Sequence, residues 1–296
     1  MSEKTKQWRG KTGGTQGMQR TLIRWFRHID TRWIIGLTAP WVFFSILFMP
    51  TACRAAWRYQ RQRLHKKGLS ACFGVWRQFF AMSHVVLDRF AAFAGQPFTI
   101  RRDDPTDLMN RLQHQPDGFV ILSSHVGNQE LAGYFTASLK PMQVLIYLGD
   151  TETMNHERAL LFEKNNLHFL PIRTDGSHIF DMHQALQRGE VLSIHGDRVF
   201  ADSRTLQAPL LGADATFPEG PFRVAAVERL PVLTMFMLRT AHNTYELRIR
   251  GLSRPDDSAL SNRALAEQLL ERYAAEIENA LRDYPEQWFN FYDVWQ

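Results

Sequence analysis

The sequence predicts an α/β fold, built on a mixed, largely parallel sheet flanked by helices. From Pro116 onward, short apolar runs alternate with stretches whose apolar residues follow helical spacing. This alternation is typical of a sheet whose strands are joined by crossover helices. At 296 residues and 45% hydrophobic content, the chain can bury a sizeable core. No internal repeat or linker divides the chain after residue 70, so one catalytic domain is the simplest organisation.

Each expected strand is a short apolar run, and the expected helices lie between these runs. The strands are predicted over 119–123, 144–147, 168–172, 191–195, 232–239 and 246–250, and the helices over 130–139, 152–165, 177–187 and 221–228. An amphipathic helix over 262–282, ended by Pro285, closes the domain. Upstream, residues 69–94 predict a long aromatic-rich helix, whose aromatic stripe suits either a core face or a lipid groove.

The N-terminal part of the chain carries the excess positive charge. The net charge is +5, and Lys and Arg crowd the first 70 residues, which favours an anionic partner. Residues 33–53 hold no charge, and a helix of that length, at about 1.5 Å per residue, just crosses a hydrocarbon core of roughly 30 Å. Because Pro40 and Pro50 interrupt this run, a single span, an in-plane segment and a buried core helix all remain open.

Three segments follow from these patterns. We expect a disordered basic tail over 1–19, a membrane-anchoring segment over 20–67 whose apolar part is 33–53, and a catalytic domain over 68–296. Cys53 and Cys72 show no metal-ligand spacing, which favours a reducing compartment, and neither suits a nucleophile. Nothing after residue 70 resembles a nucleic-acid-binding module, so no nucleic acid is expected as a partner.

His125 and Glu130 are the candidate catalytic residues. The strand over 119–123 ends directly before His125, and ligands bind at the carboxyl ends of strands in open α/β sheets. With His125 on the loop before a helix, its ring can fold back so that Glu130 accepts one ring N–H, while the other nitrogen takes a proton from a substrate hydroxyl. Gly127 permits a tight turn, and Asn128 is expected to donate to substrate or brace the loop. The alternative is a histidine that merely caps a helix.

Other strand ends supply candidate substrate-binding residues. Asp197 and Arg198 follow the strand over 191–195, on the same expected edge as His125, where the planar guanidinium suits a phosphate or an oxyanion. The alternative is a surface Asp-Arg pair in a turn. Arg173 follows the strand over 168–172 by the same logic, and the neighbouring His195 is expected to be structural.

Four blocks of the sequence carry a family resemblance. The segment from Ser124 to Gly133 (SHVGNQELAG) resembles the signature block of bacterial lipid A biosynthesis acyltransferases, the late lauroyl and myristoyl transferases. Residues 191–200 (VLSIHGDRVF), 211–221 and 284–288 (YPEQW) are similar to further blocks of that family. Phe217-Pro218-Glu219-Gly220 also reads like a phosphate-binding block of glycerol-phosphate acyltransferases. It is expected to follow no strand, so residues 194–198 (IHGDR) are the better counterpart of that block. Gly220 is expected to form a tight turn and is counted among the candidate substrate-binding residues.

The resemblance implies a glycerolipid acyltransferase-like fold and transfer of a fatty acyl group from an acyl carrier protein or coenzyme A thioester to a hydroxyl of a lipid or glycolipid. His125 would be the general base and Glu130 its partner, with neither a cofactor nor a metal. The absence of a Gly-x-Ser-x-Gly motif agrees with a mechanism that has no covalent enzyme intermediate. The implied location is the bacterial inner membrane, with the catalytic domain on the cytoplasmic face.

Two other functions stay open. A glycerophospholipid acyltransferase of the lysophosphatidate type would have the same sequence pattern, a histidine followed five residues later by an acidic residue. A non-catalytic, membrane-tethered protein that binds anionic lipid would also account for the basic N-terminal arm. Gln129 stands where Trp is common in the lipid A enzymes, so a sister group that acts on another glycolipid or a polyketide-like lipid is a further expectation.

Overall fold

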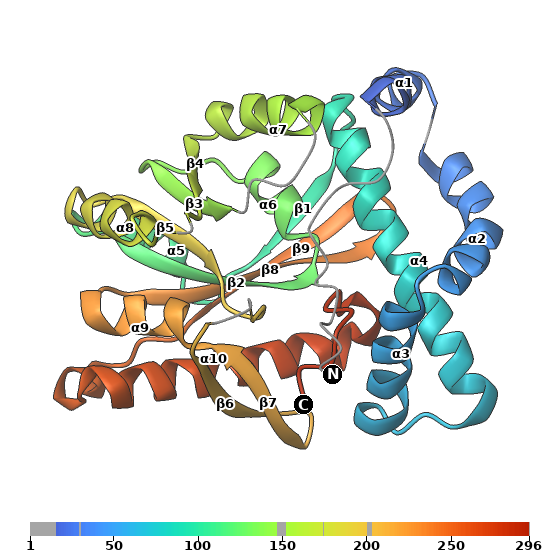
Figure 1. Cartoon of the computed structure of the whole chain (residues 1–296). Coiled ribbons are helices and arrows are strands. Elements are labelled where there is room, and N and C mark those ends of the chain that lie inside the picture. Colours follow the sequence, from blue (N-terminus) through green and yellow to red (C-terminus); the bar gives the residue numbers. More distant parts are fainter. Residues whose placement is uncertain (1–15, 30, 147–151, 174, 200–202, 296) are drawn as a thin grey trace.

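The computed structural model describes residues 16–29, 31–146, 152–173, 175–199 and 203–295 (Figure 1). The central sheet consists of seven strands: β1 (Thr99–Asp103), β2 (Phe119–Gly127), β3 (Met142–Ile146), β4 (Leu167–Pro171), β5 (Val191–His195), β8 (Val232–Ala241) and β9 (Thr244–Gly251). Strands β6 (Thr205–Leu210) and β7 (Ala213–Pro218) form a separate hairpin. The helices are α1 (Gln16–Phe26), α2 (Thr31–Leu47), α3 (Pro50–Arg58), α4 (Gly68–Phe93), α5 (Leu108–Gln113), α6 (Gln129–Phe135), α7 (Glu152–Lys164), α8 (His178–Gln187), α9 (Glu219–Glu228) and α10 (Asn262–Asp283). Short helical turns lie at Tyr59–Arg63, Pro255–Ala259 and Pro285–Gln287.

The strand order of the sheet is β1-β9-β8-β2-β5-β3-β4. The five strands from β8 to β4 are parallel, whereas β9 runs antiparallel to β8 and pairs in parallel with β1. The predicted mixed, largely parallel sheet is confirmed. Because β2 and β5 are parallel neighbours, their carboxyl ends meet at one edge, where residues 125 and 197 were expected to lie together.

Helices cover both faces of the sheet, and this explains why its central strands are apolar throughout. Alternate residues of β2 point to opposite faces: Phe119 and Ile121 join the core beneath α1, α4, α5, α6 and α7, and Val120 and Leu122 join the core beneath α8, α9 and α10. Continuous apolar runs are typical of parallel strands that are buried on both faces. Figure 1 shows α4, α6 and α7 on one side of the sheet and α9 and α10 on the other.

Every predicted strand overlaps an observed one, and three observed strands were not predicted. Strand β1 (TIRRD) is a charged edge strand, so it lacks the apolar run that identifies the others. The hairpin β6–β7 also escaped prediction. Strand β7 ends at Pro218 and α9 begins at Glu219, so the expectation that the Phe217–Gly220 block follows no strand was wrong.

The apolar N-terminal run does not form one continuous helix. Helix α2 ends at Leu47, and Pro50 opens α3, because proline is well suited to the first helical turn, where its missing N–H is not needed. Across the described parts of the chain, no helix combines the length and the apolar character that crossing a bilayer requires. The expected membrane-anchoring helix therefore has no support as a span. Residues 1–15 of the expected tail lie outside the described residues, whereas residues 16–19 belong to α1.

Candidate functional site

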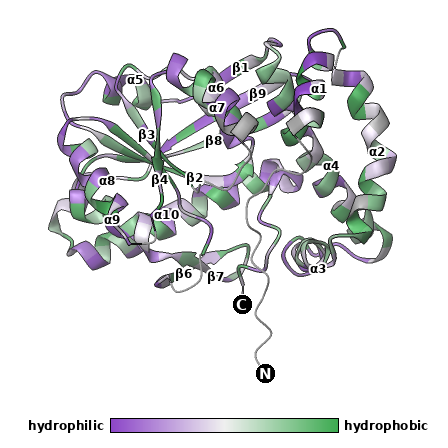
Figure 2. Cartoon of the chain, turned by 45° about the horizontal axis from the view of Figure 1, so that its top comes forward, coloured by the Kyte–Doolittle hydropathy of each residue, from purple (hydrophilic) through white to green (hydrophobic). Residues whose placement is uncertain are grey.

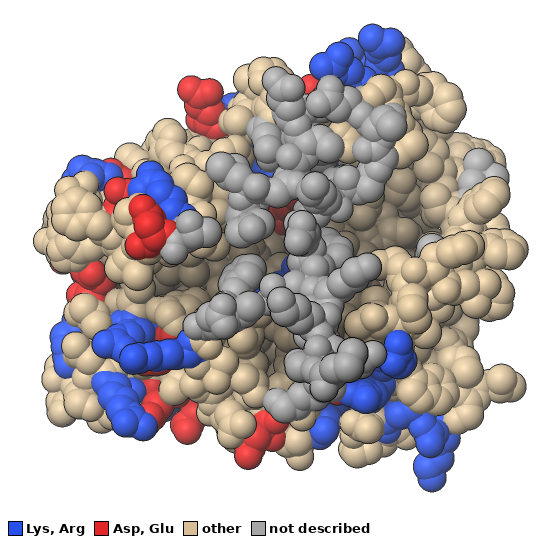
Figure 3. All heavy atoms as spheres, in the orientation of Figure 1, with Lys and Arg blue, Asp and Glu red and all other residues tan. Residues whose placement is uncertain are grey.

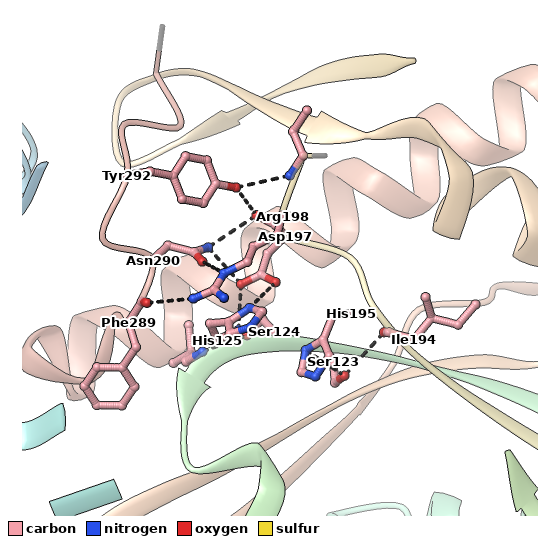
Figure 4. A network of polar contacts seen from close by, with 12 residues as sticks. Ser123, Ser124, His125, Ile194, His195, Asp197, Arg198, Phe289, Asn290 and Tyr292 are labelled. Atoms are coloured by element: carbon pink, nitrogen blue, oxygen red, sulfur yellow. Dashed lines mark hydrogen bonds and ion pairs between the residues drawn. The ribbon is translucent and has the colours of Figure 1, made fainter. Parts of the chain in front are cut away.

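His125 lies near the end of β2, where the strand departs from regular pairing. The register between β2 and β8 shifts between Ser123 and Gly127. Gly127 has a φ of 73°, and a Cβ atom at this position would lie 2.2 Å from the carbonyl oxygen of Met237. Only glycine fits such a backbone without strain. The expected tight turn at Gly127 is instead an irregular strand end, and the ring of His125 lies opposite the loop that follows β5 (Figure 4).

Asp197 is the carboxylate that pairs with His125. The ring Nδ1 of His125 lies 2.8 Å from Oδ1 of Asp197, and the backbone N–H of His125 donates to Oδ2 at 2.6 Å. One carboxylate thus holds both the ring and the main chain. This geometry places the N–H of the neutral imidazole at Nδ1, so that Nε2 is the nitrogen that can accept a proton.

The C-terminal segment after α10 encloses this pair. Asn290 donates through Nδ2 to Oδ2 of Asp197 at 2.9 Å, and the hydroxyl of Tyr292 donates to the Asp197 carbonyl oxygen at 2.6 Å. The backbone N–H of Phe289 donates to the carbonyl oxygen of His125 at 2.9 Å. Asp197 itself is fully buried. Figure 4 shows Asn290 and Tyr292, both near the chain end, pointing toward Asp197.

The electrostatics of the pair suit a neutral base beside an ionised carboxylate. Burial lowers the pKa of His125, and its attraction to Asp197 only partly offsets that effect. Burial alone would raise the pKa of Asp197, but the adjacent His125 ring and its hydrogen bonds outweigh it, and the pKa falls well below its usual range. His125 is therefore neutral and Asp197 negative near pH 7. About a quarter of the His125 side chain, 26%, is exposed, which leaves the ring accessible.

His195 stacks on His125 with ring centroids 4.6 Å apart. Its Nδ1 lies 3.3 Å from the hydroxyl of Ser123. Burial, with a smaller contribution from repulsion between the two rings when His125 is protonated, lowers the pKa of His195 to about 3. The ring is thus neutral at physiological pH and forms one wall of the site. The hydroxyl of Tyr273 donates to the Ser123 carbonyl at 2.7 Å, which fixes the end of β2 from below.

One group of potential metal ligands occurs among the described residues, and it lies at this site. A ligand atom from each of His125, His195 and Asp197 falls within 4.8 Å of the others. However, both carboxylate oxygens of Asp197 already accept hydrogen bonds from His125 and Asn290. The arrangement fits a hydrogen-bonded base better than a metal centre, and the expectation of a metal-free site stays a prediction.

Glu130 does not occupy the position that its spacing from His125 suggested. Its carboxylate accepts from Arg158 Nε at 2.8 Å and from the Tyr134 hydroxyl, and it pairs with Arg89 Nη2 at 2.6 Å. Burial would raise its pKa, but the two arginines lower it. The expected hydrogen bond from the His125 ring is made to Asp197, because Glu130 lies in the first turn of α6 and meets α4 and α7.

Asn128 braces the loop, which was one of its two expected roles. It is buried, and its Oδ1 accepts from the N–H of Leu131 at 3.3 Å as the N-cap of α6. Its Nδ2 donates to the hydroxyl of Tyr245 at 3.4 Å. Asn128 thereby fixes the step from β2 into α6 and, with it, the placement of Glu130.

The remaining candidates lie at different distances from this cluster. Arg198 adjoins Asp197, and it donates to Asn290 Oδ1 at 3.0 Å and to the Phe289 carbonyl at 3.2 Å, so it secures the C-terminal segment. Arg173 is half exposed and pairs with Asp181 at 2.6 Å, away from His125. Gly220 lies in the first turn of α9, so its assignment to a tight turn was wrong.

Several residues of the cluster were not found from the sequence. Asn290, Tyr292 and Tyr273 carry no motif, although the YPEQW block pointed to the C-terminal segment. Arg89 and Arg158 lie on helices whose sequences give no sign that both meet Glu130. The sequence indicated that His125 and Asp197 lie close together only through the expectation that functional residues follow the carboxyl ends of neighbouring parallel strands, here β2 and β5.

Comparison with known proteins identifies the family of the chain. The model of the family described as bacterial lipid A biosynthesis acyltransferase matches residues 103–296, which include β2, β5 and the whole C-terminal segment. No curated protein sequence matches the chain. A match over that share of the chain means that the chain belongs to the bacterial lipid A biosynthesis acyltransferase family and is an acyltransferase.

Proposed function

We propose that the protein transfers a fatty acyl group from an acyl carrier protein or coenzyme A thioester to a hydroxyl of a lipid or glycolipid acceptor. The observation that supports this reaction is the pairing of His125 with Asp197 at the end of β2. It leaves a neutral, partly exposed imidazole beside an ionised carboxylate. Such an arrangement is suited to removing a proton from an alcohol in one step.

In this mechanism Nε2 of His125 accepts the proton of the acceptor hydroxyl as its oxygen attacks the thioester carbonyl. The resulting tetrahedral intermediate collapses with cleavage of the carbon–sulfur bond, and the imidazolium returns the proton to the departing thiolate. Asp197 keeps the Nδ1–H tautomer in place and stabilises the imidazolium between the two steps. The products are the acyl ester and the free thiol of the carrier, so no other reactant is required.

Glu130 has a different part in this proposal. Its carboxylate joins α6 to Arg89 of α4 and Arg158 of α7, and all three side chains are largely buried. Breaking such a network by removing one partner leaves an uncompensated buried charge. We assign to Glu130 the positioning of these arginines, and to His125 and Asp197 the proton transfer.

The acceptor is proposed to lie in the cytoplasmic leaflet of the bacterial inner membrane. Mass spectrometry of total lipids from cells with and without the protein tests this assignment, with His125→Ala as the inactive variant. An added acyl chain on a glycolipid supports the proposal, whereas a change confined to phosphatidic acid indicates a glycerophospholipid acceptor. His183→Ala, which changes an exposed histidine of α8, is the matched control. Unchanged acylation by His125→Ala would contradict the role of His125 as base.

A further inference from the structure

Helix α2 presents an outward face made of large apolar side chains. Six of them are more than half exposed, among them Trp33 (76%), Trp41 (71%) and Phe48 (84%). The complete set, called the α2 apolar face, is Trp33, Trp41, Phe43, Phe44 and Leu47 of α2, together with Phe48, which directly follows the helix. A helix on the surface of a water-soluble domain normally turns charged and polar residues outward. Here, no charged residue occurs between Arg32 and Arg54.

The opposite side of α2 is already packed against the protein. Val42 is buried and Ile46 is partly buried against Val75 and Phe79 of α4. The indole N–H of Trp76, also on α4, donates to the carbonyl oxygen of Ala39 at 3.4 Å. The apolar face is therefore not a core surface left open by chance. Helix α2 thus has two apolar sides, of which one is packed against α4 and the other is exposed. Figure 2 shows α2 at the edge of the molecule.

Positive charge flanks this face. No Asp or Glu occurs from Thr31 to Leu87, whereas the same stretch holds the basic residues Arg32, Arg54, Arg58, Arg61, Arg63, Lys66, Lys67 and Arg77. In Figure 3 the edge formed by α2 is nearly free of charged atoms, and Lys and Arg gather above and below it. An exposed apolar patch with a basic border matches the boundary between the headgroups and acyl chains of an anionic membrane.

A second copy of the chain suits this face less well. A symmetric dimer through α2 would bring the basic borders of both copies together, and like charges across an interface are unfavourable. A bilayer span is also unsuitable, because α2 has 17 residues and is about 25 Å long, and the chain turns into α3 at Pro50. Two exposed tryptophans, Trp33 and Trp41, are typical of interfacial segments.

We propose that the α2 apolar face lies in the plane of one membrane leaflet and docks the enzyme on anionic phospholipid. This inference rests on the proposed function only in that a lipid acceptor requires access to a membrane. The docking itself needs neither acyl donor nor acceptor, so it can be measured separately. The aromatic side chains enter the acyl region, while the basic border contacts phosphates.

The experiment is sedimentation of the full chain with preformed vesicles of phosphatidylglycerol and phosphatidylcholine. Wild-type protein is expected to bind, and the double variant Trp41→Asp/Phe44→Asp to bind at least about tenfold more weakly, because two charges would have to enter the apolar layer. The matched control is Ile179→Asp/Phe180→Asp on α8, where both side chains are 55% and 63% exposed, and this variant should bind like wild type.

The outcomes separate docking from catalysis. His125→Ala should bind vesicles normally, while Trp41→Asp/Phe44→Asp should still acylate an acceptor dispersed in detergent. If the α2 variant bound as well as wild type, or the α8 variant lost as much binding, the proposal would be overturned. Concentration-dependent dimers that the α2 variant abolishes, without vesicle binding by wild type, would assign the face to a second copy. Thermal unfolding confirms that each variant folds, and Trp33→Asp/Phe48→Asp is the substitute if the first pair does not.

Discussion

The protonation state of His125 decides at which pH the site can act. Burial lowers its pKa below 6.5, and only the neutral ring can remove a proton. Activity should therefore be constant near pH 7 and fall as the pH drops through the His125 pKa. In a profile of kcat/KM against pH, the acid limb is expected to have its inflexion below 6.5. An inflexion above 6.5 would mean that another group limits the reaction.

The acid limb of the kcat/KM profile also distinguishes the role of Asp197 from that of Glu130. The attraction of Asp197 raises the His125 pKa, so Asp197→Asn should shift the limb to lower pH. The substitution should also lower the maximal kcat/KM by about 10²- to 10⁴-fold, because the His125 ring loses the carboxylate that fixes its tautomer and its orientation. Glu130→Gln should leave the inflexion where it is, because Glu130 is bonded to arginines and not to the ring. The reverse result, with Glu130→Gln moving the limb, would restore the pairing that the spacing suggested.

A second polar cluster supports the site from the core. The hydroxyl of Tyr245 receives a bond from Asn128 and donates to the buried Asp88, which also pairs with Arg239. Removing the hydroxyl with Tyr245→Phe takes this acceptor from the buried Asn128 amide and leaves Asp88 with Arg239, at a cost of about 1–3 kcal/mol in the free energy of unfolding. A double-mutant cycle with Asp88→Asn, measured by urea unfolding, should give a coupling energy above about 0.5 kcal/mol. Additive effects would show that the two residues act independently.

At the scale of elements, the apolar runs were sufficient to predict the central strands, since β2 and β5 are buried on both faces and read as continuous hydrophobic segments. The edge strand β1 could not be found in this way, because its burial is slight and its residues are charged. The break between α2 and α3 was signalled by Pro50, but composition alone could not decide between a kinked span and two helices packed on α4.

The bulge at the end of β2 depends on Gly127. Gly127→Ala should lower the free energy of unfolding by more than about 1 kcal/mol, because the new Cβ would meet the Met237 carbonyl in a left-handed backbone conformation. It should also reduce activity, since His125 is two residues away. Gly220→Ala is the matched control for stability: its Cβ meets nothing within 4 Å in a helical turn. If both variants unfolded at the same urea concentration as wild type, the strand end would not require glycine.

At the scale of the whole molecule, helix α4 connects α2 to the C-terminal segment that encloses His125 and Asp197. Its N-terminal half packs under α2, and Gln78 donates to the Trp288 carbonyl at 2.5 Å. Phe79 contacts Phe291 in the same C-terminal segment, with ring centroids 4.7 Å apart. That segment holds Asp197 through Asn290. Contacts between residues some 200 positions apart cannot be deduced from periodicity, and for this reason the sequence predicted the layers of the fold but not their connection to the site.

The same burial that keeps the histidines neutral makes the folded chain sensitive to acid. The pKa of His195 is lowered to about 3 and that of His84 to about 4, in both cases chiefly by burial. In the unfolded chain both rings protonate near 6.5. Between pH 6.5 and the lowered values the unfolded state binds more protons, so stability falls as the pH falls, by up to about 1.4 kcal/mol per pH unit for each ring.

Urea unfolding at steps from pH 7 to pH 4.5 measures this dependence. Glu130, whose pKa is lowered, adds to the loss of stability at the acid end of this window, where the glutamate of the unfolded chain begins to protonate. Asp88 opposes the trend because burial raises its pKa, so the comparison with variants is more informative than the wild-type slope. His195→Phe and His84→Phe should each flatten the slope by up to about 1.4 kcal/mol per pH unit, since a phenyl ring fills the buried site and cannot protonate. A slope that neither substitution changes would mean that these rings are hydrated and charged in the folded protein.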